Sequence, residues 1–452
     1  MNRFLPILKI GAILVLTVML LLPMARIHGL IQERQALRDG VVQDIARSAA
    51  YAQTLTGPVI IVPYTRKLQE QQLDADRKVV TVTREVAGEL RLLPATMDLA
   101  GQLGTEERRR GIYRARIFNA DTRLTGRFDI APGYGVADDV QSYRFGAAHL
   151  VLGISDIRGI GNALALQANG TSVNFEPGTG TELLASGVHA PLMSLTASAA
   201  PQSVSYQFDL KLQGTGYFQV APVGRDTHVM LSSNWPHPSF AGEFLPKARE
   251  VSSKGFSAEW QTSFFATNME ESLARCQPNA DASNHTCDAF HAQHFGVSFV
   301  DPVDQYLKSE RATKYAFLFI GLTFAGFFLF EVLRRYSVHP VQYGLVGLAL
   351  ALFFLLLLSF SEQIGFAAAY AVSAVACVGL ITYYVASVLG SLAHGAAFGV
   401  ALASLYGLLY GILSSEDYAL LMGSLLVFGL LATVMILTRR VIWGAIGPPQ
   451  PA

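Results

Sequence analysis

The sequence is short of charge, of cysteine and of the motifs that carry chemistry. Only 15% of its 452 residues are charged, against roughly 25% in ordinary soluble domains, and three are cysteine. The 34 basic and 34 acidic residues cancel, so composition gives no reason to expect a nucleic-acid partner. The sequence contains no nucleophile elbow, phosphate-binding loop or paired-carboxylate motif. These absences give no support to the common enzyme classes, and no cofactor is expected.

The shortage of charge lies in the second half of the chain. Charged residues are frequent from Arg26 to Lys314. From Tyr315 to Leu437 the charged residues are Glu331, Arg334, Arg335, Glu362, Glu416 and Asp417. Apolar residues make up 51% of the chain, so we expect a polar domain followed by a domain in the lipid bilayer.

Six windows are suited to transmembrane helices, because a spanning helix needs about 20 apolar residues. They are roughly 4–22, 315–333, 341–360, 366–389, 396–413 and 418–437. The alternative for the first is a cleaved signal peptide, but the PMARIHG that follows it lacks a good cleavage pattern. We therefore expect an N-terminal transmembrane helix at 1–25, a polar domain at 26–313, a five-helix transmembrane domain at 314–438 and a tail at 439–452.

Basic residues in the short loops predict the orientation, because they favour the cytoplasmic side. Pairs of arginines follow the second and sixth windows, whereas two other loops carry only acidic residues. Both termini are therefore expected in the cytoplasm, with residues 26–313 outside it. The basic residues are Arg3, Lys9, Arg334, Arg335, Arg439 and Arg440, and the acidic ones are Glu362, Glu416 and Asp417.

The membrane windows carry almost no charge in their centres. Transporters usually need ionisable groups there, facing a cavity. Glu331 lies one turn before Arg334 and Arg335, so we expect it at the interface, paired with them. Cys377 is expected to be a small buried packing residue. This pattern disfavours a transporter.

Small residues recur every fourth position in the fifth membrane window. This spacing places them on one helical face, where they allow close approach of another helix. The simpler reading is packing within the bundle, and the alternative is a contact face for a second copy of the chain. The residues are Gly395, Gly399, Ala403, Gly407 and Gly411.

The polar domain has the pattern of a mainly antiparallel β structure behind a leading amphipathic helix. Apolar and polar residues alternate at 204–212 and again at 124–130, which predicts strands with one buried face. Asn169-Gly170 separates two further strand-like runs, a strong hairpin signal. Several such strands with glycine-containing turns favour a sandwich-like domain.

The stretch CQPNADASNHTCDAFHAQHF is the best candidate for chemistry. A disulfide between Cys276 and Cys287 would close a loop of about a dozen residues in an oxidising compartment. The alternative is a metal site that adds His285, His291 and His294, although the spacing fits no common zinc pattern. A third alternative is that neither forms.

The stretch SSNWPHPSFAGEFLP is a candidate recognition loop. Trp235, His237 and Phe240 lie among three prolines, which stiffen the backbone and could leave the aromatic rings exposed. The simpler reading is a loop packed against the sheet.

The sequence resembles the CreD family of inner-membrane proteins over about residues 30 to 440. The resemblance is densest at ERQALRDGVVQDIA, TLTGPVIIVPY, LVLGISDIRGI, NWPHPSF, GVSFVDPVDQYLKSERATKYAFLFIGLTFAGFFLFEVL, HPVQYGLVGLALALFFLLLLSFSEQIGFAAAY and SEDYALLMGSLLVF. It implies a protein of the Gram-negative inner membrane with a periplasmic domain, linked to envelope integrity and to stress from β-lactams and colicins. It supplies no catalytic residues. One departure is the uncharged loop at 387–394, where the family leads us to expect arginines.

Two functions of different class follow. The first is a non-enzymatic envelope protein whose outer domain senses stress or contacts an unknown envelope protein or cell-wall partner. The second is a membrane enzyme or transporter acting on lipid or cell-wall intermediates, which would need a pocket of clustered acids, bases or metal ligands.

Overall fold

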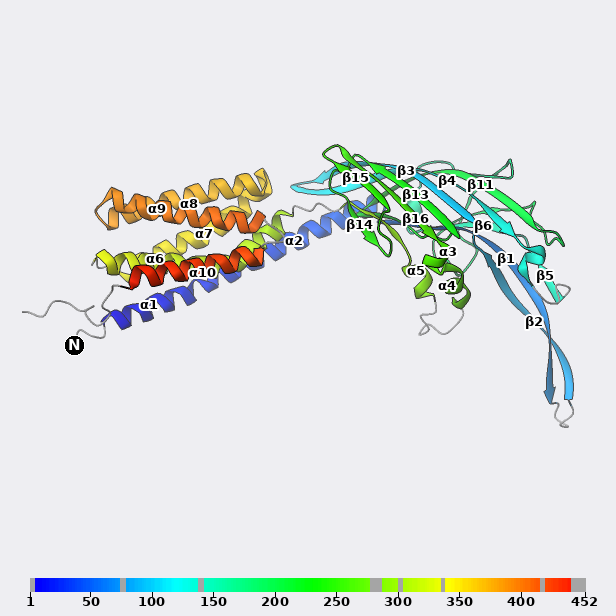
Figure 1. The fold of residues 1–452 in the computed structure, drawn as a ribbon, viewed down its shortest axis with the longest axis horizontal. Helices are drawn as coiled ribbons and strands as arrows, with labels where there is room; N and C mark the ends of the chain where they lie inside the picture. The colour runs from blue at the N-terminus through cyan, green and yellow to red at the C-terminus, as the bar shows by residue number, and fades with distance from the viewer. Residues whose placement is uncertain are drawn as a thin grey trace, which may run out of the picture. The chain divides into compact units, whose positions relative to one another are not determined.

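The computed structural model describes residues 5–73, 79–136, 142–276, 287–299, 304–334, 338–414 and 419–439. The chain divides into two units, which Figure 1 shows as ribbons. Gly40–Pro302 forms one, which we call the β unit. Met1–Asp39 and Val303–Ala452 together form the other, which we call the helical unit.

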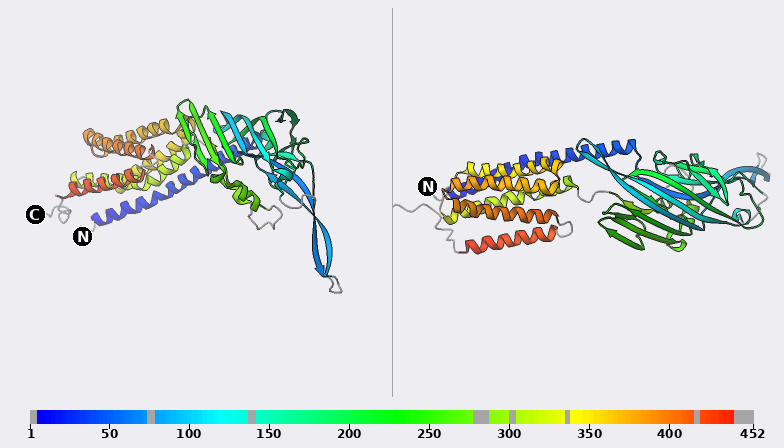
Figure 2. Two further views of the ribbon diagram at one scale, coloured as in Figure 1. Left: turned by 45° about the vertical axis from the view of Figure 1, so that its right-hand side comes forward. Right: turned by 90° about the horizontal axis from the view of Figure 1, so that it is seen from above.

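The helical unit is built from long helices that run side by side in both views of Figure 2. Four described stretches are long and apolar enough to cross a membrane, namely Gly11–Ser48, Pro340–Ile364, Phe366–Val388 and Leu392–Ser414. The helices are α1 (Leu5–Met19), α2 (Leu21–Ser48, which ends in the β unit), α6 (Gln305–Arg334), α7 (Pro340–Ile364), α8 (Phe366–Val388), α9 (Leu392–Ser414) and α10 (Ala419–Thr438).

Local signals explain where several of these helices begin and end. His339 caps α7, since its ring accepts a hydrogen bond from the backbone of Val341 while the Gln342 side chain accepts one from the backbone of His339. Pro340 occupies the first turn, where its missing N–H costs nothing. Gly390 follows α8 with φ of 58°, a conformation that stops a helix. Helix α6 begins at Gln305, before the apolar window predicted at 315–333. Its first turns are polar, so an apolar window does not include them.

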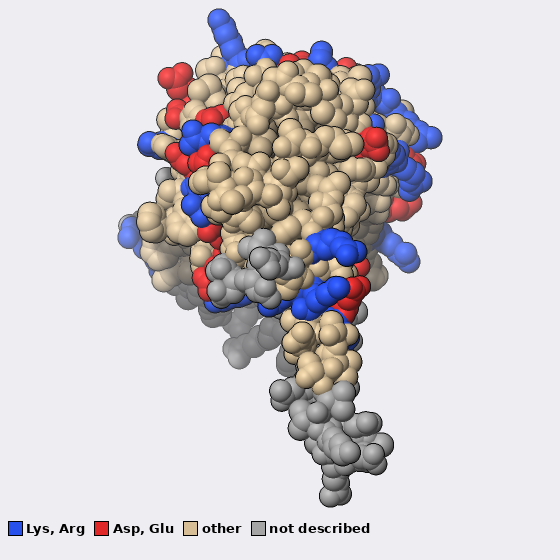
Figure 3. All heavy atoms as spheres, turned by 90° about the vertical axis from the view of Figure 1, so that its right-hand side faces the viewer, with Lys and Arg blue, Asp and Glu red and all other residues tan. Residues whose placement is uncertain are grey.

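The β unit contains two sheets. The first has nine described strands, with β1 (Gln53–Leu73) at its centre. Seven of them run in the order β14-β17-β12-β1-β6-β10-β9, and β2 and β5 pair with β1 beside this path. The others are β2 (Val79–Leu92), β5 (Tyr143–Phe145), β6 (His149–Ile154), β9 (Glu176–Pro177), β10 (Gly187–Pro191), β12 (Tyr217–Val220), β14 (Ser239–Gly242) and β17 (Phe295–Ser298). The β1–β2 hairpin projects from the body of the unit (Figures 1 and 3).

The second sheet has eight described strands in the order β15-β16-β13-β3-β4-β11-β7-β8. They are β3 (Thr96–Arg110), β4 (Tyr113–Ile130), β7 (Ala165–Ala168), β8 (Thr171–Asn174), β11 (Gln202–Thr215), β13 (Asp226–Ser233), β15 (Ala248–Ser252) and β16 (Gly255–Ser263). The short helices are η1 (Pro132–Gly135), η3 (Ile157–Gly159), α3 (Phe264–Thr267), α4 (Met269–Arg275) and α5 (Asp288–Ala292).

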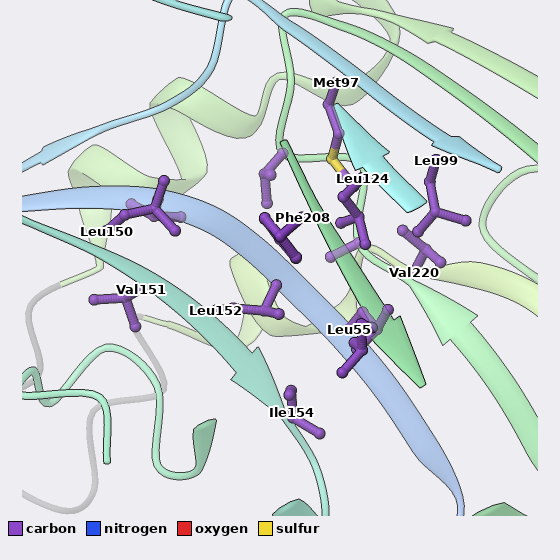
Figure 4. Packing of buried hydrophobic residues seen from close by; sticks show 14 of the residues in the cluster. Leu55, Met97, Leu99, Leu124, Leu150, Val151, Leu152, Ile154, Phe208 and Val220 are labelled. Carbon is purple, nitrogen blue, oxygen red and sulfur yellow. The ribbon is translucent and has the colours of Figure 1, made fainter. Parts of the chain in front are cut away.

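The core of the β unit lies between the two sheets. Along β11 buried and exposed residues alternate, so Phe208 and its neighbours on that face turn inward. Figure 4 shows this side chain with Leu124 near Leu55 and Leu152 of the other sheet. The predicted alternation at 204–212 and 124–130 is therefore confirmed.

Other sequence expectations for the β unit are partly confirmed. The turn at Asn169-Gly170 joins β7 to β8, and both residues have positive φ, 47° and 81°. The described strand pairs are mainly antiparallel, as expected, but β1 pairs parallel to β12 and β3 parallel to β13. Parallel pairing joins segments far apart in the sequence, so no local turn signals it.

Within the β unit, a polar clamp joins the last turn of α2 to the strands. Asp156 is buried, and its carboxylate accepts hydrogen bonds from the Arg158 side chain at 2.6 Å and 2.9 Å and from the backbone of Tyr51 at 3.0 Å. Arg158 in turn donates to the backbone oxygen of Arg47, in the last turn of α2, at 2.9 Å. The Gln53 side chain donates to the backbone oxygen of Asp156 at 2.9 Å.

The clamp predicts an acid-dependent loss of stability. The hydrogen bonds from Arg158 lower the pKa of Asp156 from 3.8 to about 2. A lowered folded-state pKa stabilises the protein above the ordinary value, and this contribution is lost as pH falls from about 4 toward 2. Asp156→Asn should therefore lower the free energy of unfolding by about 2 kcal/mol at neutral pH, with the difference from the parent shrinking below pH 4.

Unfolding of the full chain in detergent can be followed by the fluorescence of Trp235 and Trp260, both buried in the β unit. Asp209→Asn is the matched control, because Asp209 pairs with Arg123 on the surface, where an ion pair contributes less than about 1 kcal/mol. Equal losses in the two variants at neutral pH would contradict the clamp.

Candidate functional site

A groove of about 1160 Å³ runs along β2 in the β unit. Residues 86–92 of β2 form one side of it, and α4 forms part of another. Its walls also include the end of β4, at residues 129–130, and Glu182, which lies between β9 and β10. We call this site the β2 groove. Figure 3 views the β unit from the side on which the hairpin projects, with charged side chains mainly around the edge of that face.

Ionic groups inside the β2 groove are held by specific partners. The Arg91 guanidinium donates to Glu89 at 2.8 Å and to the backbone oxygen of Cys276 at 2.6 Å. The Thr181 hydroxyl lies 2.8 Å from both carboxylate oxygens of Glu89 and shares its single proton between them. These contacts connect β2 to the end of α4 and to the β9–β10 segment, so the groove walls are tied together.

The second ion pair of the groove joins Arg225 to Glu270 of α4 at 2.6 Å. Glu182 is exposed at the groove wall. Among the described lining residues the groups present are carboxylates, guanidinium groups, tyrosine hydroxyls and apolar side chains. They are suited to binding a partner through hydrogen bonds, charge and apolar contact.

The two cysteines predicted as a pair, Cys276 and Cys287, are joined by a disulfide. It links the end of α4 to the start of α5, and Cys276 is 2% exposed. Because both sulfurs are in this bond, neither is available as a thiolate ligand for a metal.

The other members of the alternative metal site give it no support in the part of the chain that the structure describes. His285 lies outside the described residues. No group of three or more His, Cys, Asp or Glu side chains among the described residues is placed to hold a metal ion.

The candidate recognition loop packs against the second sheet. Trp235 is 6% exposed, with the Arg116 guanidinium 3.7 Å above its ring and its indole N–H donating to the backbone oxygen of His237 at 2.8 Å. The Phe240 ring lies 5.7 Å from that of Trp260. Only His237 of the three predicted residues is exposed. The structure therefore corresponds to the simpler reading of this stretch.

The glycine stripe of α9 is divided between two environments. Gly395 and Gly399 are buried against Ala386 and Thr382 of α8. Ala403 and Gly407 are instead exposed. Gly411, at the end of the stripe, lies near Met422 of α10.

Ala403 and Gly407 line an open apolar groove of about 710 Å³ between α8 and α9. A side chain added at Gly407 would meet no neighbour within 4 Å. Close packing of two helices therefore explains only the first half of the stripe.

Glu331 has a partner that the sequence did not predict. Its side chain is buried, and it accepts hydrogen bonds from the Tyr343 hydroxyl of α7 at 2.9 Å and the Val338 backbone at 3.3 Å. The predicted pairing with Arg334 and Arg335 involves side chains outside the part that the structure describes, so it stays a prediction. Cys377 is buried, as expected.

A polar cluster in the helical unit was missed by the sequence reasoning. Glu362 at the end of α7 accepts a hydrogen bond from the buried Tyr306 hydroxyl at 3.0 Å and lies 3.8 Å from Arg34 of α2. Arg38, one turn further along α2, pairs with Asp304 just before α6. The basic face of α2 was the available signal, because Arg34 and Arg38 are four residues apart.

The architecture defines the chain as a membrane protein in which apolar helices accompany a large, mainly β unit. The sequence profile of a family described as "Inner membrane protein CreD" matches residues 6–444. A relative of that name from Escherichia coli (strain K12) is 38% identical over 441 residues, which cover 97% of this chain and 93% of the relative. The chain therefore belongs to the CreD family of inner membrane proteins, as the sequence resemblance indicated.

Solved structures add no argument about function. Two structures of an M1 zinc metallopeptidase from Deinococcus radiodurans each match 38% of this chain, at 12% and 10% identity. The match covers 39% and 38% of those chains, with TM-scores of 0.20 and 0.19. Such scores carry no inference about fold or chemistry. Neither the family description nor the relative's name indicates a catalytic activity.

The division of the glycine stripe predicts different effects at two positions. Gly399→Leu should lower the stability and the amount of folded protein, because its side chain would collide with Thr382, and overpacking costs roughly 1–3 kcal/mol. Gly407→Leu should fold as the parent does, because the space beside it is open. Thermal unfolding and yield of the full chain in detergent would measure both.

Equal destabilisation by the two substitutions would contradict this division. The same pair also tests the alternative of a second copy at the exposed half of the stripe. Loss of self-association in Gly407→Leu, at unchanged thermal stability, would place the second copy there. If Gly407→Leu associates with itself as the parent does, the stripe serves packing within one chain and is not a contact face for a second copy.

Proposed function

We propose that this inner-membrane protein supports cell-envelope integrity under stress through binding by its β unit, without catalysing a reaction. The observation that carries the proposal is the β2 groove, whose polar groups are arranged as ion pairs and hydrogen bonds around a cavity large enough for a partner. Membership of the CreD family indicates that the protein is an inner membrane protein. The partner is an envelope protein or a cell-wall component.

The proposed topology has six spans, with both termini in the cytoplasm and residues 26–313 in the periplasm. Arginine pairs at 334–335 and 439–440 favour the cytoplasmic side, whereas Glu362, near the end of α7, and the acidic pair at 416–417 have no Lys or Arg near them in the sequence. The disulfide between Cys276 and Cys287 supports this proposal, because disulfides persist in oxidising compartments such as the periplasm.

Reporter fusions test this arrangement. Alkaline phosphatase inserted after residue 200 should be active, because the enzyme needs periplasmic oxidation of its own cysteines. The same reporter at the C-terminus should be inactive, with comparable fusion levels verified by immunoblotting. An inactive internal fusion with an active C-terminal fusion would reverse the topology.

A second function has one observation in its favour. The buried Glu331 is an ionisable group inside the helical unit, bonded to Tyr343, and such groups often mark ion or proton pathways. The competing proposal is therefore a transporter acting on a lipid or cell-wall intermediate. If Glu331 takes part in transport, its charge has to change during the transport cycle. If Glu331 has only a structural role as the hydrogen-bond acceptor of Tyr343, its charge does not have to change.

Glu331→Gln separates the two functions. Glutamine keeps a carbonyl that can accept from Tyr343 but removes the charge. Under the binding proposal, growth of cells under β-lactam stress should stay near the parent level. Loss of resistance at an unchanged amount of membrane-inserted protein would favour the transporter. Tyr383→Phe, at an exposed tyrosine of α8, is the control for substitutions in the bundle.

A further inference from the structure

Among the strands that the structure describes, β2 pairs with β1 alone. It pairs with β1 from Ile60↔Leu92 to Leu73↔Val79, and no strand among the described residues pairs with its other edge. Residues 86–92 of this strand line the β2 groove. An unpaired edge presents a row of backbone N–H and C=O groups that can bind another strand.

The direction of these backbone groups follows from the pairing of β1. The Pro63 oxygen accepts a hydrogen bond from the Gly146 backbone at 2.7 Å, and Gly146 follows β5, on the side of β1 opposite β2. Backbone groups of successive residues point to alternate sides of a strand. Val62 and Tyr64 therefore present their N–H and C=O groups to β2.

The register then identifies the free groups of β2. Leu90 lies opposite Val62 and Gly88 opposite Tyr64, so these two residues bond to β1. Ala87, Glu89 and Arg91 consequently present their backbone N–H and C=O groups to the groove.

The two faces of β2 differ in chemistry next to this free edge. Leu90 and Leu92 pack against the core, while Glu89 and Arg91 form their ion pair on the opposite face. Side chains of a strand alternate between faces, so a neighbouring strand would place apolar side chains beside the leucines and polar ones beside the ion pair.

The charge of the groove favours a basic partner. Its lining has four carboxylates, Glu89, Asp129, Glu182 and Glu270, against two guanidinium groups, Arg91 and Arg225. Three of the carboxylates have an arginine partner at 2.6 Å to 2.9 Å. Glu182 is exposed at the wall, where a lysine or arginine of a partner could pair with it.

We propose that the β2 groove binds an extended peptide segment of an envelope protein by strand addition to β2. The segment alternates apolar and polar residues and carries a basic residue on its polar face. Backbone hydrogen bonds to Ala87, Glu89 and Arg91 supply its affinity, and the two faces of β2 with the acidic wall supply its specificity. This inference rests on the proposed binding function and names the class of partner.

The probe is a fluorescein-labelled peptide of alternating valine and threonine with a central lysine, long enough to span residues 86–92. Its binding to the detergent-solubilised full chain is measured by fluorescence anisotropy. A second peptide carries N-methyl groups on alternate amides, and a third has glutamate in place of lysine. Both changes should weaken binding at least about tenfold, because they remove backbone donors or reverse the charge.

Two proline variants of β2 test the edge itself. Ala87→Pro removes an outward N–H without removing a bond to β1, so it should weaken binding of the first peptide about tenfold at unchanged stability. Thr83→Pro is the matched control, since Thr83 has the same outward direction but lies outside the groove lining. Glu182→Lys should reverse the preference between the lysine and glutamate peptides.

No saturable binding by any peptide, equal binding of the N-methylated peptide, or equal loss in both proline variants would overturn the proposal. If Glu182→Lys still preferred the lysine peptide to the glutamate peptide, the charge of the groove would not select the partner. The assignment of a basic partner would then be overturned. The broader binding function is tested separately in cells under β-lactam stress. Variants with charge reversals on each exposed face of the β unit are compared with the parent. If all of them keep the parent's resistance to β-lactams, the β unit does not act by binding, even if the peptides bind in the anisotropy experiment.

Discussion

Strand β1 is the element on which the β unit depends. It pairs with β12, β6, β5 and β2 at successive positions along its length, so it joins most of the first sheet. Its residues 59–62 are fully buried, so both faces of this stretch of β1 lie inside the β unit. The same pairing leaves β2 with a single neighbour among the described strands and thereby creates the free edge of the groove.

The helical unit is organised by different forces. Without a hydrophobic driving force between helices in lipid, close contact and hydrogen bonds decide which helices meet. Gly395 and Gly399 provide the contact of α9 with α8, and Tyr343 reaches Glu331 between α7 and α6. The polar cluster around Glu362 adds a further set of such bonds between segments far apart in the chain.

Features set by local sequence could be predicted, and those set by distant pairing could not. The alternation around Phe208 predicted β11, and the turn at Asn169-Gly170 predicted the hairpin of β7 and β8, because both depend on neighbouring residues. The free edge of β2 depends on which strands pair with β1, and the alternation of apolar and polar residues in the sequence does not determine this pairing. The hydrogen bond between Tyr343 and Glu331 was not predicted for the same reason, since it joins two different helices.

The disulfide also has a consequence for the order in which the molecule matures. It covalently fixes the end of α4, the helix that forms part of the groove wall beyond β2. With the β unit in the periplasm, as proposed, a newly made chain could close this bond only after export. The groove wall that α4 forms would then be covalently fixed only in the compartment where the proposed partner is found.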